Sequence, residues 1–142
     1  YTLIFMKYPE KYIERGRFRL HSGEESDFLY DINALLTNPL YRTYILKNIS
    51  PCSHYVGIAT AGEVIAMLVA DRHNARVSVV KDGKLKGEIP LEEWILIDDV
   101  VTTGNSLIGA LKIIKTAPKE IIVAVDRRTD KSKINIRSLF TI

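Results

Sequence analysis

The chain has 142 residues, a length that usually forms one domain around one core, so a multidomain protein is not expected. Lys and Arg number 20 against 17 Asp and Glu, and 46% of the residues are hydrophobic, which argues against a disordered chain and against a nucleic-acid-binding tail. The longest wholly apolar run, 64–70, is far shorter than a membrane span. We therefore expect one soluble, cytoplasmic domain over residues 1–142 that binds neither membranes nor nucleic acid.

Metal and disulfide chemistry have little support in the composition. The single cysteine, Cys52, cannot form an internal disulfide, and the three histidines lie at unrelated spacings, so a structural zinc site lacks ligands. The net charge of +3 favours an anionic partner but produces only a weak field. A small phosphorylated substrate is therefore favoured over nucleic acid, with simple solubility as the alternative.

The first 50 residues predict a small cap. Arg17–Leu20 and Phe28–Ile32 are short candidate strands, and Pro39–Asn48 is a candidate helix with proline near its first turn. No repeat or long linker separates this region from the remainder of the chain, so we expect the cap and the following residues to form one unit.

The residues after 50 predict alternating strands and helices. Continuous β-branched apolar runs are typical of strands buried on both faces, and two stretches have the 3.6-residue period of helices. This alternation predicts an α/β fold with a parallel sheet and flanking helices. The expected strands are Tyr55–Ile58, Arg76–Val80, Trp94–Ile97 and Ile121–Val125, and the expected helices are Glu63–Asp71 and Asn105–Lys115.

The most informative segment is Trp94–Leu107, which reads WILIDDVVTTGNSL. Asp98 and Asp99 follow an apolar strand, at the edge where open α/β sheets bind ligands. The hydroxyl and backbone N–H groups that follow lie at a helix N-terminus and suit a phosphate. These groups belong to Thr102, Thr103, Gly104, Asn105 and Ser106.

An ordinary structural explanation of this segment remains open. The two acids can simply end a strand, while Thr103 or Asn105 caps the helix. Adjacent acids at the end of a buried strand are costly, however, unless cations or hydroxyl groups use them. The combination of acids and phosphate-binding groups therefore favours a sugar-phosphate site.

The segment ILIDDVVTTGNS closely resembles the phosphoribosyl pyrophosphate (PRPP) signature of the type I phosphoribosyltransferases. VGIATAG, at Val56–Gly62, resembles the pyrophosphate loop of the orotate phosphoribosyltransferases, and the terminal SLFTI resembles their last strand. The N-terminal signature F-x-L-x-S-G-x-x-S-x-x-x-x-D of that family is matched by Phe18, Leu20, Ser22, Gly23, Ser26 and Asp31. The chain is therefore similar to an orotate phosphoribosyltransferase from about Phe18 onward.

This resemblance implies the parallel-sheet fold of the type I enzymes, with a small N-terminal cap, or hood. It implies Mg²⁺-dependent transfer of phosphoribosyl from PRPP to orotate, which gives orotidine 5′-phosphate and pyrophosphate. Asp98 and Asp99 would hold the ribose hydroxyls directly or around Mg²⁺, a metal that is often bound by carboxylates and substrate phosphates together. Val101 to Ser106 would wrap the 5′-phosphate.

The resemblance also assigns the loop after the first expected buried strand. Backbone N–H groups of Ala59, Thr60 and Ala61 would meet the pyrophosphate, and Gly62 would allow its close approach. The alternative is an ordinary strand-to-helix turn.

Family members bring lysines and an arginine from a mobile loop onto the pyrophosphate, often across a dimer interface. Val80–Lys86 aligns with their R-K-x-x-K-x-H run, in which Lys81 and Lys84 match as catalytic residues. Val80 replaces the arginine and Lys86 the histidine, the loop before Asp98 is shortened, and His21 replaces a lysine that the family often has. A homodimer is implied, with a solvated turn as the alternative role for these lysines.

Arg127 stands where orotate-specific members place an arginine near the carboxylate of the base, a group that arginine can pair with in bidentate fashion. Tyr30 could stack on the pyrimidine or contact its edge, and a half-buried aromatic of a strand is the alternative. PRPP and orotate are therefore the expected substrates. The departures at His21 and Val80 leave two alternatives open, namely transfer to another base in salvage and a PRPP-binding regulatory protein.

Overall fold

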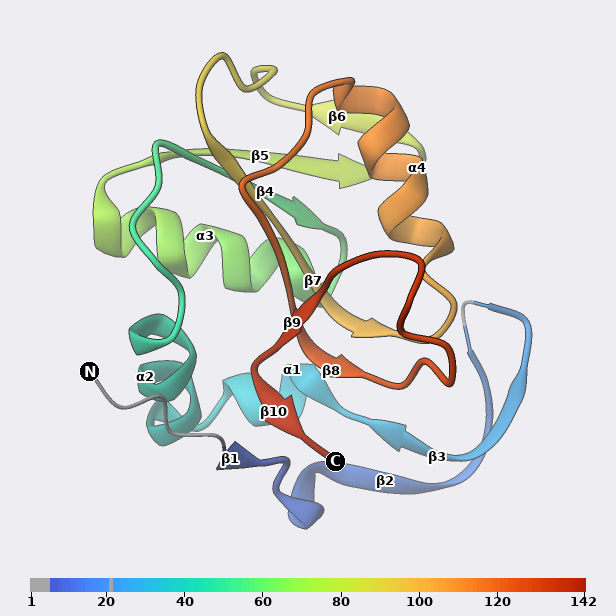
Figure 1. The fold of residues 1–142 in the computed structure, drawn as a ribbon. Coiled ribbons are helices and arrows are strands. Elements are labelled where there is room, and N and C mark those ends of the chain that lie inside the picture. The colour runs from blue at the N-terminus through green and yellow to red at the C-terminus, as the bar shows by residue number, and fades with distance from the viewer. Residues whose placement is uncertain (1–5, 21) are drawn as a thin grey trace.

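The computed structural model describes residues 6–20 and 22–142. Its main sheet consists of β4 (His54–Ile58), β5 (Arg76–Lys81), β6 (Lys84–Lys86), β7 (Trp94–Val101), β8 (Glu120–Asp126) and β9 (Arg137–Ser138). The strand order is β6-β5-β4-β7-β8-β9 (Figure 1). All the neighbouring pairs in this sheet are parallel except β5 and β6, which are antiparallel. The predicted parallel sheet is confirmed, with β7 among its inner strands.

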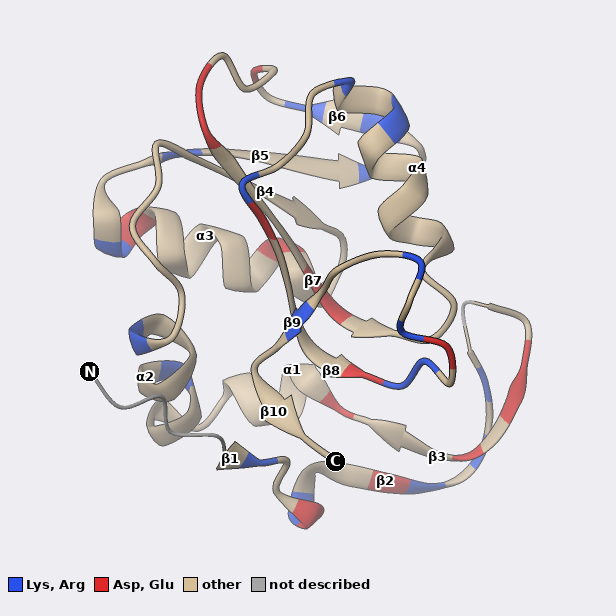
Figure 2. Cartoon of the chain, viewed as in Figure 1, with Lys and Arg blue, Asp and Glu red and all other residues tan. Residues whose placement is uncertain are grey.

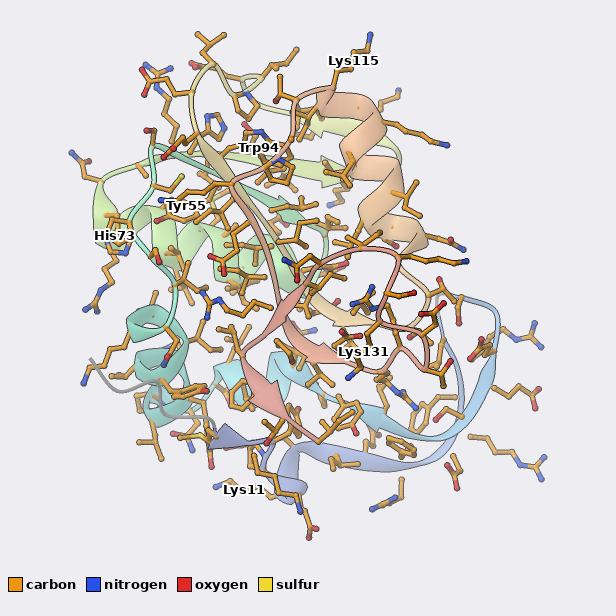
Figure 3. The ribbon with its side chains drawn as sticks, in the orientation of Figure 1. Lys11, Tyr55, His73, Trp94, Lys115 and Lys131 are labelled. Carbon is orange, nitrogen blue, oxygen red and sulfur yellow. The ribbon has the colours of Figure 1, made fainter. Side chains whose placement is uncertain are left out.

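Helices cover both faces of this sheet, as the continuous apolar strands predict. The two covering helices are α3 (Ala61–His73) and α4 (Asn105–Ile114). Successive residues of a strand point to opposite faces, so Tyr55 packs in the α3 layer and Val56 in the α4 layer. In the same way Ile95 packs in the α3 layer and Trp94 packs in the α4 layer. Tyr55 and Trp94, one from each layer, are labelled in Figure 3.

The cap consists of a hairpin and two helices. Its elements are a short 3₁₀ helix (Glu10–Tyr12), β2 (Ile13–Arg19), β3 (Glu25–Tyr30), α1 (Ile32–Leu36) and α2 (Pro39–Lys47). The predicted strand over Phe28–Ile32 ends early, because the Asp31 side chain accepts a 3.0 Å hydrogen bond from the Ala34 N–H and begins α1. The predicted α2 is confirmed, with Pro39 in its first turn and Asn38 as its cap.

The two ends of the described chain lie side by side. Strand β1 (Met6–Lys7) pairs in parallel with β10 (Phe140–Thr141), separately from the main sheet (Figure 1). The terminal SLFTI segment is therefore divided, since Ser138 belongs to β9 and pairs with Val123 of β8. Phe140 is buried against Tyr8 at a centroid distance of 5.5 Å, which joins this edge to the core around α3.

Strand β7 is longer than its apolar run predicts. It continues to Val101, so Asp98 and Asp99 lie inside the strand rather than after it. β8 pairs with β7 as far as Val101 opposite Asp126, whereas β4 pairs with it only as far as Ile97. Asp98 and Asp99 thus lie in the part of β7 that β4 no longer pairs with and that β8 still accompanies.

Among the residues that the structure describes, no helix is long and apolar enough to cross a membrane.

Candidate active site

A cavity of about 330 Å³ opens where β4 ends beside β7. Its walls come from the end of the cap hairpin and the start of α1, from the loop after β4, from the end of β7 and from the residue that follows β8. The predicted site residues that line it are Tyr30, Ala59, Thr60, Ala61, Asp98, Asp99, Thr102, Ser106 and Arg127. The structure therefore brings together residues that are widely separated in the sequence.

The acidic pair is held by the backbone of its own strand. The Asp99 N–H donates a 2.8 Å hydrogen bond to Oδ1 of Asp98, and the Val100 N–H donates a 2.7 Å bond to Oδ1 of Asp99. Asp98 is buried, and burial, followed by the negative charge of Asp99, raises the pKa of its carboxyl well above the usual value. Each carboxylate has a second oxygen, so the pair can bind a cation or hydroxyl groups.

The loop after β7 forms a second, smaller hollow of about 50 Å³ that shares Asp98, Val100, Thr102 and Ser106 with the main cavity. The predicted phosphate-loop residues that line only this hollow are Val101, Thr103, Gly104 and Asn105. The N-cap of α4 is Gly104, which is in the left-handed conformation with φ +94°. This residue has no side chain that could accept a hydrogen bond from the N–H groups of the first turn. In the alternative structural explanation of this segment, Thr103 or Asn105 caps the helix. The N-cap position is instead Gly104, although Thr103 Oγ1 accepts a 3.3 Å bond from the Asn105 N–H.

The two helices that cover the main sheet, α3 and α4, begin differently from the two cap helices. Neither α3, with Thr60 as its N-cap, nor α4, with Gly104, is capped by the side chain of its N-cap residue, although in α4 the Asn105 N–H bonds to Thr103 Oγ1. In contrast, α1 and α2 are capped by the side chains of Asp31 and Asn38. Uncapped N–H groups at a helix N-terminus favour an anion, so the ends of α3 and α4 can both receive phosphate oxygens.

The loop between β4 and α3 differs in part from the expectation. The Ala59 N–H donates a 3.0 Å bond to Val80 O, so it is not free for a ligand, and this leaves Thr60 and Ala61. The peptide bond between Ala59 and Thr60 is cis. Gly62 does not line the cavity; a Cβ there would lie 2.9 Å from Ile97 O, so this glycine permits close packing of α3 on β7.

Arg127 is positioned by several contacts from distant segments. Its N–H donates a 2.8 Å bond to Val101 O, and its Nη2 donates a 3.0 Å bond to Ser26 Oγ in the cap hairpin. The guanidinium lies 4.4 Å from the ring centroid of Phe28 and 5.3 Å from that of Tyr30. Its Nη1 is buried and has no hydrogen-bond partner among the described residues.

Tyr30 lines the same cavity at the end of β3. It is half-buried, and its ring packs edge-on against Tyr8 at a centroid distance of 4.9 Å and against Phe28 at 5.4 Å. This geometry accommodates both the predicted contact with a pyrimidine and the alternative of a packed strand aromatic.

A buried ion pair flanks Arg127. Arg128 donates from Nε and Nη2 to the two carboxylate oxygens of Asp126, at 3.0 and 2.9 Å, and from Nη1 to Ile134 O at 3.0 Å. Burial alone would raise the pKa of Asp126, but its hydrogen bonds with Arg128 outweigh this and lower it. The pair fixes the loop between β8 and β9, in which Lys131 is labelled in Figure 3.

Lys81 and Lys84 lie outside the cavity. They are opposite each other across the hairpin of β5 and β6, and the turn between them has positive φ at Asp82 and Gly83. The segment that aligns with the family's mobile loop therefore contains a two-residue turn between β5 and β6, and β4 separates this hairpin from β7. Val80, which replaces the family's arginine, is buried in the α4 layer, and the pleat places Lys81 and Lys84 on the opposite, α3 face.

Other cavity residues were not predicted as site residues. Two of the polar ones are Arg19, which ends β2, and Asn33, which lies in the first turn of α1. Their sequence signal was their place within or next to the N-terminal signature, between Phe18 and Asp31 for Arg19. His21, which replaces the family's lysine, lies outside the described residues.

Charge is distributed unevenly around this site. Figure 2 shows acidic residues along β7 and basic residues in the loop between β8 and β9. Among the described residues, no three His, Cys, Asp or Glu side chains gather into a metal site. A cation held by Asp98 and Asp99 would therefore need further oxygen ligands from water or from a substrate.

The sequence is similar to known enzymes over most of its length, although no family model matches it. It is 34% identical to the orotate phosphoribosyltransferase of Pyrococcus abyssi over 135 residues, covering 81% of this chain and 74% of that protein. The orotate phosphoribosyltransferase of Pyrococcus furiosus is 34% identical over 145 residues, covering 88% and 80%.

Solved structures agree with these relatives. Orotate phosphoribosyltransferase from Aeropyrum pernix matches with a TM-score of 0.70 at 25% identity, covering 82% of this chain and 77% of that one. Adenine phosphoribosyltransferase from Saccharomyces cerevisiae matches with a TM-score of 0.64 at 16% identity, covering 92% and 94%, which is a likeness of fold alone. The predicted type I phosphoribosyltransferase fold is confirmed, and the chain belongs to the orotate phosphoribosyltransferase family.

Proposed function

We propose that this chain transfers the phosphoribosyl group of PRPP to orotate, giving orotidine 5′-phosphate and pyrophosphate. The proposal is carried by a cavity and an adjoining hollow that together combine an acidic pair, a phosphate-type loop and an arginine with an unpaired nitrogen. These groups match the ribose hydroxyls, the phosphates and the carboxylate of the two substrates. The family of the chain supports the same reaction.

PRPP is assigned to the carboxyl ends of β4 and β7. The 5′-phosphate lies in the hollow formed by Val101–Ser106, at the N-terminus of α4, whose N-cap is Gly104. The pyrophosphate lies beside Thr60 and Ala61 at the uncapped N-terminus of α3. The ribose then bridges these two anion positions, with its hydroxyls at Asp98 and Asp99.

The acidic pair also suits Mg²⁺. This cation takes oxygen ligands, usually retains several waters and is often held by one or two carboxylates together with substrate phosphates. Two adjacent carboxylates, with no third His, Cys, Asp or Glu beside them in residues 6–20 and 22–142, fit that pattern, so Asp98 and Asp99 are proposed as its protein ligands. When bound, Mg²⁺ would offset the negative charge of the pyrophosphate.

Orotate is assigned to the part of the cavity between Tyr30 and Arg127. A planar guanidinium whose Nη1 has no hydrogen-bond partner among the described residues suits the carboxylate of the base. Tyr30 offers an aromatic surface or edge to the pyrimidine, and both residues line the cavity that holds the acidic pair.

The reaction needs positioning and charge stabilisation rather than a nucleophilic side chain. A ring nitrogen of orotate bonds to C1′ of the ribose as the bond from C1′ to pyrophosphate breaks. Positive charge develops on the sugar, close to the carboxylates of Asp98 and Asp99, and negative charge develops on the leaving pyrophosphate. Fixed groups of opposite sign at these positions lower the barrier without reorganising.

Lys81 and Lys84 are assigned to the pyrophosphate of a second copy of the chain, in a symmetric homodimer. The tight turn between them keeps both lysines at the edge of the sheet, outside their own cavity. A cytoplasmic location is part of the same proposal.

The deciding experiment measures pyrophosphate release from PRPP and Mg²⁺ with orotate, uracil, adenine and hypoxanthine. Release with orotate alone is the expected result. Release only with another base would favour the salvage alternative. Tight binding of PRPP without release for any base would favour a regulatory protein, an alternative supported by the exclusion of both lysines from the cavity.

A further inference from the structure

The guanidinium of Arg127 is held on two sides by the cap hairpin. Ser26 Oγ accepts its Nη2–H at 3.0 Å, and the ring of Phe28 lies under it at 4.4 Å. Both contacts come from β3, which is far from Arg127 in the sequence and belongs to a separate two-stranded sheet. Of the guanidinium nitrogens of Arg127, Nη1 is the one that is buried without a hydrogen-bond partner among the described residues.

The Ser26 hydroxyl has no freedom to turn away. It donates a 2.8 Å hydrogen bond to Phe28 O, and it accepts one from the Phe28 N–H at 3.3 Å and one from Arg127. A hydroxyl has one donor hydrogen and two acceptor positions, so these three bonds use its full capacity. Because two of the three bonds are with the Phe28 backbone, one lone pair of the Ser26 hydroxyl is left for Nη2 of Arg127.

Ser26 and Phe28 do not themselves border the main cavity, as far as its described lining shows. Ser26 therefore acts on a ligand through Arg127, whereas Phe28 acts both through Arg127 and through Tyr30, whose ring packs against it at a centroid distance of 5.4 Å. Resting on the function proposed above, we propose that Ser26 and Phe28 are positioning residues that set the preference for a carboxylate-bearing base, by fixing Arg127 with Nη1 as its unsatisfied donor.

The physical reason has two parts. A guanidinium that is already oriented loses little side-chain freedom when the base binds. A buried donor without a partner also penalises any base that lacks a carboxylate, because that base leaves the donor unpaired. If the guanidinium were free to swing, it could find other partners, and the penalty against bases without a carboxylate would disappear.

The test compares Ser26→Ala and Phe28→Leu with the conservative variants Ser26→Thr and Phe28→Tyr. Ser50→Ala, which removes an exposed hydroxyl elsewhere, is the matched control. For each protein, kcat/KM is measured with orotate and with uracil, which is the same ring without the carboxylate, and KM is measured for PRPP. We expect Ser26→Ala and Phe28→Leu to lower the orotate-to-uracil ratio about tenfold, as the loss of a hydrogen bond to a charged group implies.

The KM for PRPP should stay at the parental value in all these variants, and the conservative variants should restore the ratio. A second measurement does not depend on turnover. In ¹⁵N NMR spectra, the Arg127 guanidinium, assigned through Arg127→Lys, should show separate Nη signals in the parent and averaged signals in Ser26→Ala.

Three outcomes would count against the proposal. An unchanged ratio in Ser26→Ala and Phe28→Leu, in a parent that uses orotate, would overturn it and leave the proposed function intact. An equal loss with orotate, uracil and PRPP would show a general structural role. A parent that releases no pyrophosphate with orotate would remove the proposed function, and with it the specificity role, while the NMR comparison would still decide whether Ser26 fixes the guanidinium.

Discussion

The backbone N–H of Arg127 donates a 2.8 Å hydrogen bond to the carbonyl oxygen of Val101. Val101 is the last residue of β7, where the phosphate-type loop begins, and Arg127 follows β8. This bond ties the proposed phosphate position to the proposed base position. The bond lies directly after the last paired residues of β7 and β8, which are Val101 and Asp126. The register of these two neighbouring strands therefore determines the distance between the two parts of the site.

Replacing Asp98 and Asp99 together by Asn should abolish turnover with little loss of fold. The carboxylates are assigned to ribose and Mg²⁺, and losing such transition-state contacts costs roughly 10²–10³-fold in kcat. Stability should be maintained or raised, because burial and the charge of Asp99 already oppose ionisation of Asp98. Pyrophosphate release, PRPP binding by calorimetry and thermal unfolding measure these effects. Asp71→Asn on the exposed side of α3 is the control, and parental PRPP binding by the double variant would show the assignment to be wrong.

Arg127→Ala should weaken orotate binding far more than PRPP binding. It removes the proposed carboxylate partner, and a lost hydrogen bond to a charged group is worth about 1.5–3 kcal/mol. Arg127→Lys keeps the charge without the planar fork and should give an intermediate loss. Separate titrations with orotate and PRPP measure the two effects. Equal losses for both ligands would indicate a structural arginine.

Lys81 and Lys84 should act across the subunit interface. Lys84→Ala and the Asp98→Asn/Asp99→Asn variant should each be inactive alone. Coexpressed together, they should recover at most about a quarter of parental activity, since half of the dimers are mixed and each mixed dimer has one intact site. The rate of pyrophosphate release in the mixture measures this recovery. Parental activity in both Lys81→Ala and Lys84→Ala would rule out a role for this hairpin.

His54 should make the protein less stable at mildly acidic pH. Its ring is buried, its Nε2 lies 2.7 Å from Ser78 Oγ, and burial lowers its pKa from the usual 6.5. Below pH 6.5 the unfolded chain binds a proton that the folded chain resists, so the free energy of unfolding should fall as pH decreases through this range. Urea unfolding between pH 5 and pH 8 measures this slope. His54→Gln should flatten it, and an identical slope in that variant would assign the effect to other groups.

Gly62→Ala should destabilise the fold, because the new Cβ would lie 2.9 Å from Ile97 O and 3.0 Å from Asp98 Cα. Both atoms belong to the backbone of β7 and cannot turn aside, so overpacking should cost about 1–3 kcal/mol. Gly109→Ala in α4 is the matched control, because its Cβ meets no described atom within 4 Å. That variant should gain about 0.5–1 kcal/mol from helix propensity. Urea unfolding measures both, and a similar effect of the two substitutions would contradict the packing argument.

The sequence by itself determined the features that depend on neighbouring residues. Apolar runs such as Ile121–Val125 predicted buried strands, and the period of 105–115 predicted α4, because these patterns reflect which faces of an element are covered. The segment around Asp98 also predicted the acidic pair and the phosphate-type loop, since both lie within a few consecutive residues. The family resemblance rests on the same local strings.

Only the tertiary structure decided the features that depend on pairing between distant segments. The length of β7 follows from its continued pairing with β8 beyond the end of β4, which no property of the Asp98 segment reveals. The contact of Arg127 with Ser26 joins residues 101 positions apart. Side chains of this kind meet because the cap hairpin lies beside the end of β8, and that placement results from packing of the whole core rather than from the pattern of either segment.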